Sequence, residues 1–140
     1  MGTQDLEKQE LFDAFREGAE AAGKDPETMP KIVETFVVVG GQEEAEYAAN
    51  LWRFTVDPWS DELLYESDPR EIQRKAEEMF SLEEVYQNWP MGEDAETHVE
   101  ALQGFLDSGA TRLFVHSGQQ DQQRVIDFYG SEVLPQLRSS

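Results

Sequence analysis

Four consecutive apolar residues, Phe36-Val37-Val38-Val39, constrain the fold more than any other stretch of this sequence. Strands with one wet face alternate apolar and polar residues, whereas strands of a parallel sheet are buried on both faces and form continuous apolar runs. The run therefore predicts a parallel strand over residues 32–39, which ends at Gly40-Gly41. A helix should follow it, because small and aromatic residues recur on one helical stripe: Ala45, Ala48, Ala49 and Trp52.

A second strand, turn and helix lie near the C-terminal end of the sequence. The short apolar run 113–115 predicts a buried strand, and His116 and Ser117 stand where that strand should end. Gly118 permits a tight turn, and Asp121 is placed to cap the next helix. Parallel sheets carry their functional groups at the carboxyl ends of the strands, which makes this edge the candidate site.

His116 is the best single functional candidate in the sequence. It could hydrogen-bond a ligand or transfer a proton, or it could be a structural histidine bonded to a neighbouring carbonyl. Trp89 likewise has two readings, as an aromatic wall of a pocket or as core packing. His98 should lie near the start of a helix on a wet face.

The remaining pattern predicts helices around these strands. Amphipathic helices are expected over 4–22, from Pro69 to about Phe80, in a short segment capped by Ser81, from Asp94 to Gly109, and after Asp121 with a kink at Gly130 or Pro135. Residues 88–91 read as a short strand or a turn. The order is a helix followed by three strand–helix units, which implies right-handed parallel crossovers.

Residues 55–67 interrupt that order with a long connection that carries Trp59 and Tyr65. Long loops in compact α/β domains are often functional or lid-like. The alternative is a satellite hydrophobic cluster that covers one end of the sheet.

Composition narrows the class of protein. The chain has 140 residues, no cysteine, and 30 acidic against 11 basic residues, a net charge of −19. We expect one soluble, cytoplasmic domain that has neither disulfides nor thiolate chemistry. The charge disfavours nucleic acid and anionic membranes as partners. It indicates either a surface adapted to high salt or a polyanion mimic that binds a basic partner.

Several catalytic motifs are missing from the sequence. It has no Walker or dinucleotide phosphate loop, no spacing of histidines and acids typical of a metal site, and no serine nucleophile elbow. We therefore expect no metal and find no complete catalytic set by motif.

Four stretches together resemble the C-terminal part of luciferase-like monooxygenase-family oxidoreductases, and most of all the glucose-6-phosphate dehydrogenases that use the deazaflavin coenzyme F420. They are Glu17-Gly18-Ala19-Glu20-Ala21-Ala22-Gly23-Lys24-Asp25-Pro26, Trp89 with Gly92-Glu93-Asp94-Ala95-Glu96-Thr97-His98-Val99, Phe114-Val115-His116-Ser117-Gly118-Gln119-Gln120-Asp121-Gln122, and Leu134-Pro135-Gln136-Leu137-Arg138. The acidic, lysine-poor composition further looks like a haloarchaeal version.

The resemblance implies a fold and a cofactor. The family folds as a (β/α)8 TIM barrel, so this chain would be the C-terminal part of one, a leading helix and about three βα units with parallel strands. We expect a single partial-barrel domain over 1–140, with the leading helix in 1–30, the first βα unit with inserted helices in 31–88, and the last two βα units in 89–140. Coenzyme F420, or alternatively FMN, would bind only in a complete barrel, where hydride passes between substrate and cofactor.

The resemblance also implies which residues of this chain line the substrate. The family's catalytic residues have no counterpart here, so the expected site residues line the substrate: Phe36, Leu63, Asn88, Trp89 and His116. The sugar-phosphate enzymes carry basic residues at the positions of Phe36, Leu63 and Asn88. Together with Trp59, these substitutions favour an apolar alcohol, aldehyde or carbonyl compound over glucose 6-phosphate.

Two functions follow as expectations. In the first, the chain is part of an F420-dependent oxidoreductase, inactive alone, and needs a second copy or a chain that supplies the N-terminal barrel half. In the second, it is a non-catalytic acidic α/β module that oligomerises or binds a partner.

Overall fold

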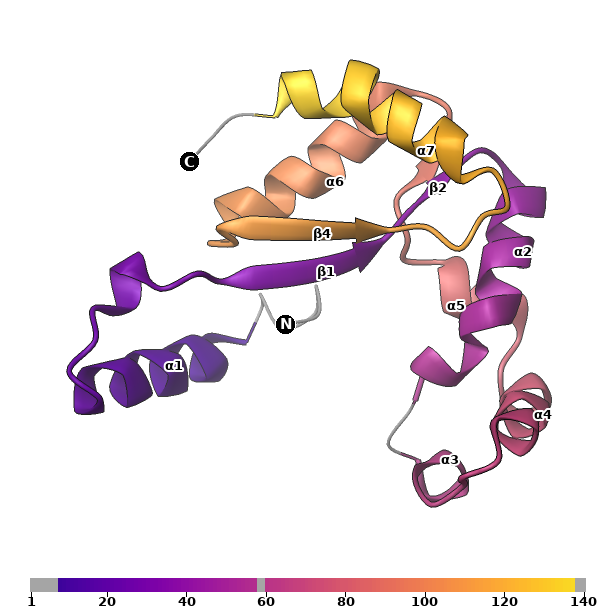
Figure 1. The fold of residues 1–140 in the computed structure, drawn as a ribbon, viewed down its shortest axis with the longest axis horizontal. Helices are drawn as coiled ribbons and strands as arrows, with labels where there is room; N and C mark the ends of the chain where they lie inside the picture. Colours follow the sequence, from indigo (N-terminus) through magenta and orange to yellow (C-terminus); the bar gives the residue numbers. More distant parts are fainter. Residues whose placement is uncertain (1–7, 58–59, 138–140) are drawn as a thin grey trace.

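The computed structural model describes residues 8–57 and 60–137, and Trp59 therefore lies outside the described residues. Within them the protein is an α/β fold whose strands all pair in parallel (Figure 1). The strands are β1 (Ile32–Phe36), β2 (Val38–Val39), β3 (Met91–Gly92) and β4 (Arg112–His116). The α/β class and the parallel pairing predicted from the sequence are confirmed.

The predicted strand over 32–39 is divided at Val37 and pairs on both of its edges. β1 pairs with β4 in a register that sets Ile32 beside Arg112 and Phe36 beside His116. The Val37 N–H continues that ladder by donating to the His116 carbonyl at 2.8 Å, and Val38 N–H then turns to the Pro90 carbonyl at 2.9 Å. Beyond Val37 the pairing therefore passes to β3, on the other edge.

Helices occupy most of the remaining chain. They are α1 (Gln9–Ala21), α2 (Gln42–Trp52), α3 (Asp61–Leu64), α4 (Pro69–Met79), α5 (Leu82–Tyr86), α6 (Ala95–Asp107) and α7 (Gln122–Phe128), with 3-10 turns at Pro26–Thr28, Arg53–Thr55 and Leu134–Gln136. Four of them begin at a residue whose side chain accepts a backbone N–H of the first turn: Asp68, Ser81, Asp94 and Asp121. Ser81 and Asp121 were predicted as caps.

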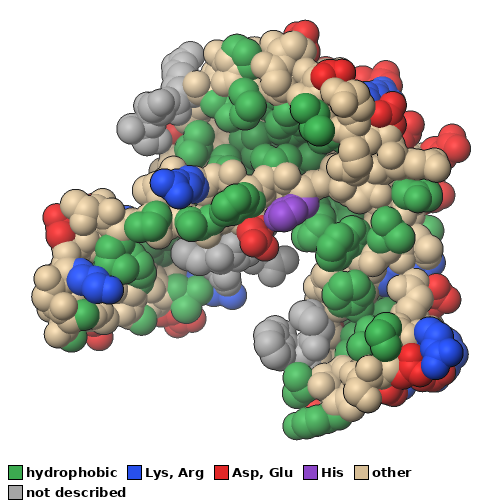
Figure 2. Space-filling model, in the orientation of Figure 1, with side chains coloured by type: hydrophobic (Ala, Val, Ile, Leu, Met, Phe, Trp, Pro, Cys, Tyr) green, Lys and Arg blue, Asp and Glu red, His purple; other side chains and the backbone are tan. Residues whose placement is uncertain are grey.

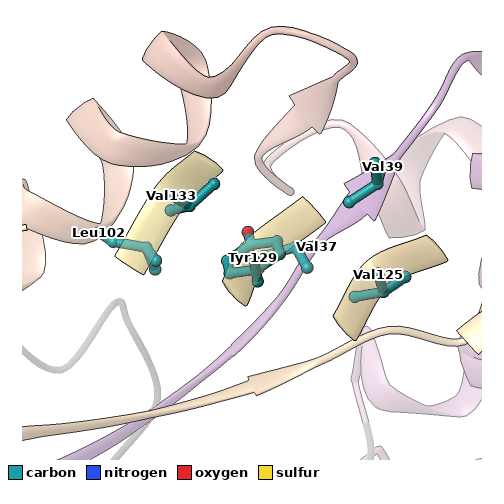
Figure 3. Close-up of a cluster of buried hydrophobic side chains, with 6 residues drawn as sticks. All are labelled: Val37, Val39, Leu102, Val125, Tyr129 and Val133. Atoms are coloured by element: carbon teal, nitrogen blue, oxygen red, sulfur yellow. The ribbon is translucent and has the colours of Figure 1, made fainter. Parts of the chain in front are cut away.

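Helices α6 and α7 cover one face of the strands (Figure 1). Alternate strand residues point to them, and the largest core cluster lies in this layer (Figure 3): Val37, Val39, Leu102, Val125, Tyr129 and Val133. Val38 points the opposite way and packs with Ala45 and Ala48 of α2. Residues 37–39 are therefore covered on both faces, as their unbroken apolar run predicts.

The other face of β1 and β4 is open between α1 and the arm formed by α2, α5, α4 and α3 (Figure 1). Phe114 on this face is 50% exposed, and Glu34 and Arg112 are exposed. Parallel strands are normally covered on both faces. This part of the sheet consequently lacks a covering layer within the described residues.

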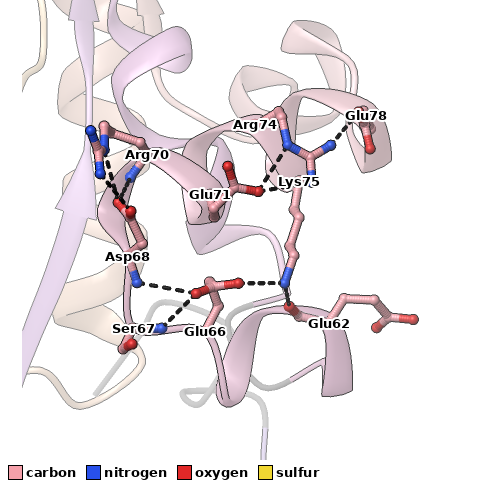
Figure 4. Close-up of polar contacts among 9 residues, drawn as sticks. All are labelled: Glu62, Glu66, Ser67, Asp68, Arg70, Glu71, Arg74, Lys75 and Glu78. Carbon is pink, nitrogen blue, oxygen red and sulfur yellow. Dashed lines mark hydrogen bonds and ion pairs between the residues drawn. The ribbon is translucent and has the colours of Figure 1, made fainter.

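The connection over 55–67 is more structured than a long loop. It contains α3, whose Leu63 is buried at 5% exposure, and α3 contacts α4. Lys75 Nζ binds Glu66 Oε2 at 2.7 Å and the Glu62 carbonyl at 3.2 Å (Figure 4). The Lys75 ammonium is the main cause that lowers the pKa of Glu66. This packing agrees with a satellite cluster, but α3 packs on α4 at the far end of the arm and does not cover an end of the sheet (Figure 1).

The C-terminal helix changes its winding near the predicted kink. α7 ends at Phe128 and continues as a π-helix over Tyr129–Val133, which includes Gly130. The π-helical turn buries both Tyr129 and Val133 against α6. None of the helices in the described part of the chain has the length and apolar content needed to cross a membrane.

Candidate functional site

Two of the predicted site residues meet because of the strand register. β1 and β4 end together, and Phe36 lies directly beside His116. Both side chains point away from α6 and α7, because the alternate residues Val37 and Val115 pack into the core between those helices. The phenyl and imidazole rings are 5.6 Å apart between centroids. The carboxyl end of the paired strands therefore carries both rings on the open face.

Trp89 joins them from the turn that precedes β3. The next residue, Pro90, accepts the Val38 N–H, and this bond holds the turn against the edge of β2. The Trp89 ring stacks on Phe36 at 5.2 Å and 23°. Three of the five predicted residues, Phe36, Trp89 and His116, are thus brought together by long-range pairing.

Trp52, the last residue of α2, completes this group of rings. Its indole lies 5.1 Å from the Phe36 ring at an interplanar angle of 54°. The helical stripe predicted Trp52 on the buried side of the helix, but its contact with Phe36 was not predicted. The only signal was its place at the end of the stripe nearest the aromatic connection. We call Phe36, Trp52, Trp89 and His116 the aromatic cluster.

Two predicted residues lie apart from the aromatic cluster. Leu63 is buried in α3, where it belongs to the α3–α4 packing at the far end of the arm (Figure 1). Asn88 is exposed and precedes Trp89 in the chain. The structure gives neither side chain a ring contact or hydrogen bond to the cluster within the described residues.

The surroundings of the aromatic cluster are apolar, with charges further along the strands. Hydrophobic side chains gather beside the exposed histidine on the open side of the molecule (Figure 2). Glu34 precedes Phe36 by two residues on the same face, and Arg112 precedes His116 by four. At about 3.3 Å per residue, the backbone positions of these two residues lie about 7 and 13 Å along the strands from Phe36 and His116. The phenyl and indole rings of the cluster carry no charge, whereas acidic side chains also lie close to the histidine on this face (Figure 2).

Ion pairs connect the segments that follow β2, β3 and β4 in the chain. Arg124 of α7 pairs with Glu44 of α2 at 3.6 Å and with Glu93 of the loop after β3. The Glu44 carboxylate also accepts the Gly41 N–H at 3.0 Å, and backbone N–H groups hold the pKa of Glu44 below its usual value. A cavity of about 250 Å³ lies here, lined mostly by acids and amides, and it includes none of the aromatic cluster.

His98 does not lie on a wet face, and that prediction was wrong. Its side chain is fully buried in α6. Nδ1 lies 2.8 Å from the Tyr129 hydroxyl, and Nε2 lies 3.1 Å from the Gly92 carbonyl. A carbonyl only accepts, so Nε2 carries the proton and Nδ1 accepts from Tyr129. His98 is a fully bonded structural histidine, distinct from the exposed His116.

No family model matches the chain. Curated relatives do match it over nearly its whole length. It is 44% identical over 134 residues to an F420-dependent hydroxymycolic acid dehydrogenase of Mycobacterium tuberculosis, covering 96% of this chain and 35% of the relative. It is 31% and 28% identical to F420-dependent glucose-6-phosphate dehydrogenases of Nakamurella multipartita and Mycolicibacterium gilvum, covering 92% and 96% of this chain and 38% and 40% of those relatives.

The fold agrees with these sequence matches. An F420-dependent secondary alcohol dehydrogenase, solved with an F420–acetone adduct, superposes with a TM-score of 0.76 and 25% identity over 99% of this chain and 41% of that protein. The homologues of this chain are therefore F420-dependent dehydrogenases, and the chain spans only 35–40% of the length of the curated relatives described above.

Proposed function

We propose that the chain is the C-terminal portion of a coenzyme F420-dependent oxidoreductase of the (β/α)8 barrel type, and that it supplies the substrate-side wall of the pocket. One observation carries this proposal. Phe36, Trp89 and His116 meet at the carboxyl ends of paired parallel strands, where Phe36 and His116 belong to the open face and the partly buried Trp89 also packs against the cluster of Val38 and α2. That edge is where α/β barrels and open parallel sheets bind their substrates.

The open face supports an incomplete barrel. In a closed barrel the inward side chains of each strand are covered by strands across the interior. Glu34, Arg112 and Phe114 point to that side here and are exposed. The homologues are more than twice as long, which accords with further strands that cover this face. Those strands would come from additional chain, a separate chain that supplies the N-terminal half, or a second copy.

The substrate we propose is an uncharged alcohol, aldehyde or hydrophobic carbonyl compound. Phe36, Leu63 and Asn88 stand where the resemblance places basic residues in the sugar-phosphate enzymes. Each lost charge-assisted hydrogen bond would weaken phosphate binding by about 1.5–3 kcal/mol. The higher identity to a relative named for hydroxymycolic acid than to those named for glucose 6-phosphate supports the same choice.

The residues of this chain do not fit the role of holding the cofactor. F420 and FMN both carry phosphate, which calls for basic side chains or a cradle of backbone N–H groups. In the described part of the chain, no lysine or arginine makes a cation–π contact with the aromatic cluster, and the cavity beside Arg124 is lined mostly by acids and amides. We therefore assign the cofactor contacts to the missing strands and propose that the chain alone is inactive.

The proposal is tested by titrating F420 into two proteins at high salt and following the deazaflavin absorbance. The first is the chain alone. The second is the chain joined to the segment of the M. tuberculosis relative that lies outside the matched region. We expect no binding by the chain alone. We expect F420 binding by the joined protein, and F420 reduction with cyclohexanol but not with glucose 6-phosphate.

Other results would contradict specific parts of the proposal. Tight F420 binding by the chain alone would show that the cofactor contacts were assigned wrongly. A folded joined protein that turns over neither F420 nor FMN would contradict the oxidoreductase proposal. It would favour the alternative, an acidic module that oligomerises or binds a basic partner.

A further inference from the structure

The contacts that fix Trp52 in place differ from those that fix the other members of the aromatic cluster. Phe36, Trp89 and His116 belong to strand ends or to a turn bonded to a strand, whereas Trp52 comes from the last position of α2. The helix itself leaves the indole free to adopt other rotamers. Some other contact must therefore fix the indole against Phe36.

That contact is Gly118, in the turn after β4. A Cβ atom at position 118 would lie 2.9 Å from Trp52 Nε1, 3.1 Å from Trp52 Cδ1 and 3.2 Å from Ala48 Cα. Real Cβ atoms essentially never come within 3.0 Å of another atom, and 3.1–3.2 Å is tighter than most real contacts, so a Cβ here would force the indole or the helix backbone to shift. The glycine thus allows the turn to lie directly on the five-membered edge of the indole.

The turn is itself anchored and cannot move away from Trp52. The buried Gln119 side chain accepts the Val39 N–H at 2.9 Å and donates to the Val39 carbonyl at 3.2 Å. The Ser117 hydroxyl donates to the same Gln119 amide oxygen at 3.2 Å. Gly118 is consequently clamped between β2 and α2, and the position of the turn sets the position of the indole.

The nitrogen of Trp52 shows that the arrangement is not optimised for stability. Nε1 is buried and has no hydrogen-bond partner among the described residues. A buried unpaired donor is unfavourable, and a phenylalanine or leucine would fill the space without one. Departures of this kind are expected where a residue serves function, and here the indole adds a second large ring beside Phe36.

Building on the function proposed above, we propose that Trp52 determines substrate specificity and that Gly118 is its positioning residue. The tilted rings of Trp52 and Phe36 and the stacked ring of Trp89 make one neutral aromatic wall. Such a wall selects ketones and secondary alcohols that carry a bulky apolar group beside the reacting carbon. It offers a sugar phosphate no charged anchor.

The test follows the indole N–H signals of the chain by NMR. The protein contains three tryptophans, and Trp→Phe variants assign their signals. Cyclohexanone is the probe, and glucose 6-phosphate is the comparison compound. We expect cyclohexanone to shift the Trp52 and Trp89 signals with one common dissociation constant, and glucose 6-phosphate to shift neither. No response of Trp52 to cyclohexanone would overturn the proposal, whether or not Trp89 responds.

Matched glycine variants separate positioning from general damage. We expect Gly118→Ala to move the Trp52 signal without probe and to weaken cyclohexanone binding by about tenfold, the scale of one misplaced contact in an apolar pocket. Gly104→Ala is the control, because a Cβ there meets no atom within 4 Å and alanine favours a helix. Cyclohexanone binding by Gly118→Ala at the wild-type level would contradict the positioning role.

A double variant tells this role from a purely structural one. Trp52→Phe combined with Gly118→Ala removes the ring edge that the new Cβ would strike. We expect the double variant to regain part of the stability lost in Gly118→Ala, since the contact with Ala48 Cα remains, but not the affinity for cyclohexanone. Recovery of both would make Trp52 a packing residue only.

Kinetic measurements on the joined protein distinguish a failure of this specificity proposal from a failure of the proposed function. Absence of F420 reduction with every alcohol would contradict the proposed function. F420 reduction with cyclohexanol at equal kcat/KM in wild type and Trp52→Phe would contradict only the specificity role. We expect kcat/KM for cyclohexanol to fall about tenfold in Trp52→Phe.

Discussion

At the residue scale, the two histidines show how burial separates structural from functional roles. His98 is fully buried with both ring nitrogens bonded, whereas His116 is exposed at the strand end beside Phe36. An imidazole that is buried with both ring nitrogens hydrogen-bonded has no nitrogen left to bind a ligand. His116 is accordingly the exposed histidine, which suits the wall role proposed for it above.

The His98–Tyr129 bond makes a direct prediction for stability. Tyr129→Phe keeps the ring that packs in the core but leaves His98 Nδ1 without its donor. We expect the free energy of unfolding to fall by about 1–3 kcal/mol, the usual effect of an unpaired buried group. Urea denaturation measures it, with the half-exposed Tyr47→Phe as the control. Equal losses in the two variants would contradict this role of the hydroxyl.

The cap of α6 predicts a pH dependence of stability. The Thr97 N–H, at 2.8 Å from the carboxylate, is the main cause that lowers the pKa of Asp94 from its ordinary 3.8. A lowered pKa stabilises the fold above the ordinary value, and this contribution is lost as the pH falls through the lowered one. Asp94→Asn keeps a capping acceptor that does not titrate.

We therefore expect the stability difference between wild type and Asp94→Asn to be largest near neutral pH and to shrink below about pH 4. Urea denaturation across that range measures it. Glu100→Gln is the control, since it removes a charge from the same helix without touching the cap. A difference that stays constant with pH would show that the carboxylate charge is not involved.

At the element scale, a side chain continues the sheet where the strands separate. β4 pairs with β1 only as far as the Val37–His116 bond, after which the chain turns away. The Gln119 amide then occupies the place of a further strand residue, because it bonds both the N–H and the carbonyl of Val39. The edge of β2 that faces β4 is satisfied without a longer strand.

Because the Gln119 side chain takes the place of a strand residue, we expect its removal to lower the stability of the protein strongly. Gln119→Ala removes the acceptor of the buried Val39 N–H, and we expect a loss of about 2–4 kcal/mol in unfolding free energy. Hydrogen exchange at the Val39 amide should accelerate along with it. Gln120→Ala, at the exposed neighbouring position, should change stability by no more than about 0.5 kcal/mol. Unchanged exchange at Val39 would argue against the ladder role.

At the scale of the whole molecule, charge is the dominant feature. Thirty acids and eleven bases give −19, and acidic side chains occur on the main body and on both projecting parts (Figure 2). Like charges repel over roughly 10 Å at 0.1 M salt but over only about 3 Å at 1 M. The compact state is therefore favoured by salt.

We expect the thermal midpoint to rise as KCl is raised from about 0.1 M to 2 M, because screening removes repulsion among the acids. Circular dichroism follows the transition. Sorbitol at matched osmolality is the control for stabilisation that does not depend on charge. Full stability in dilute buffer would contradict adaptation to high salt and would leave the acidic surface to the alternative role of binding a basic partner.

The sequence by itself determined the features that depend on neighbours in the chain. The unbroken run Phe36–Val39 indicated burial on both faces, and Asp68, Ser81 and Asp121 marked helix starts, because caps and periodicity act within a few residues. The strand over 113–115 was placed within one residue at each end.

Only the tertiary structure decided which distant residues meet. The pairing of β4 with β1, the burial of His98 under Tyr129, and the contact of Trp52 with Gly118 join residues far apart in the chain. Local preferences do not encode such pairings, because they depend on register and on how α2, α6 and α7 pack. For the same reason the sequence placed Trp52 on a helical stripe and Gly118 in a turn, but only the fold showed that the two residues meet.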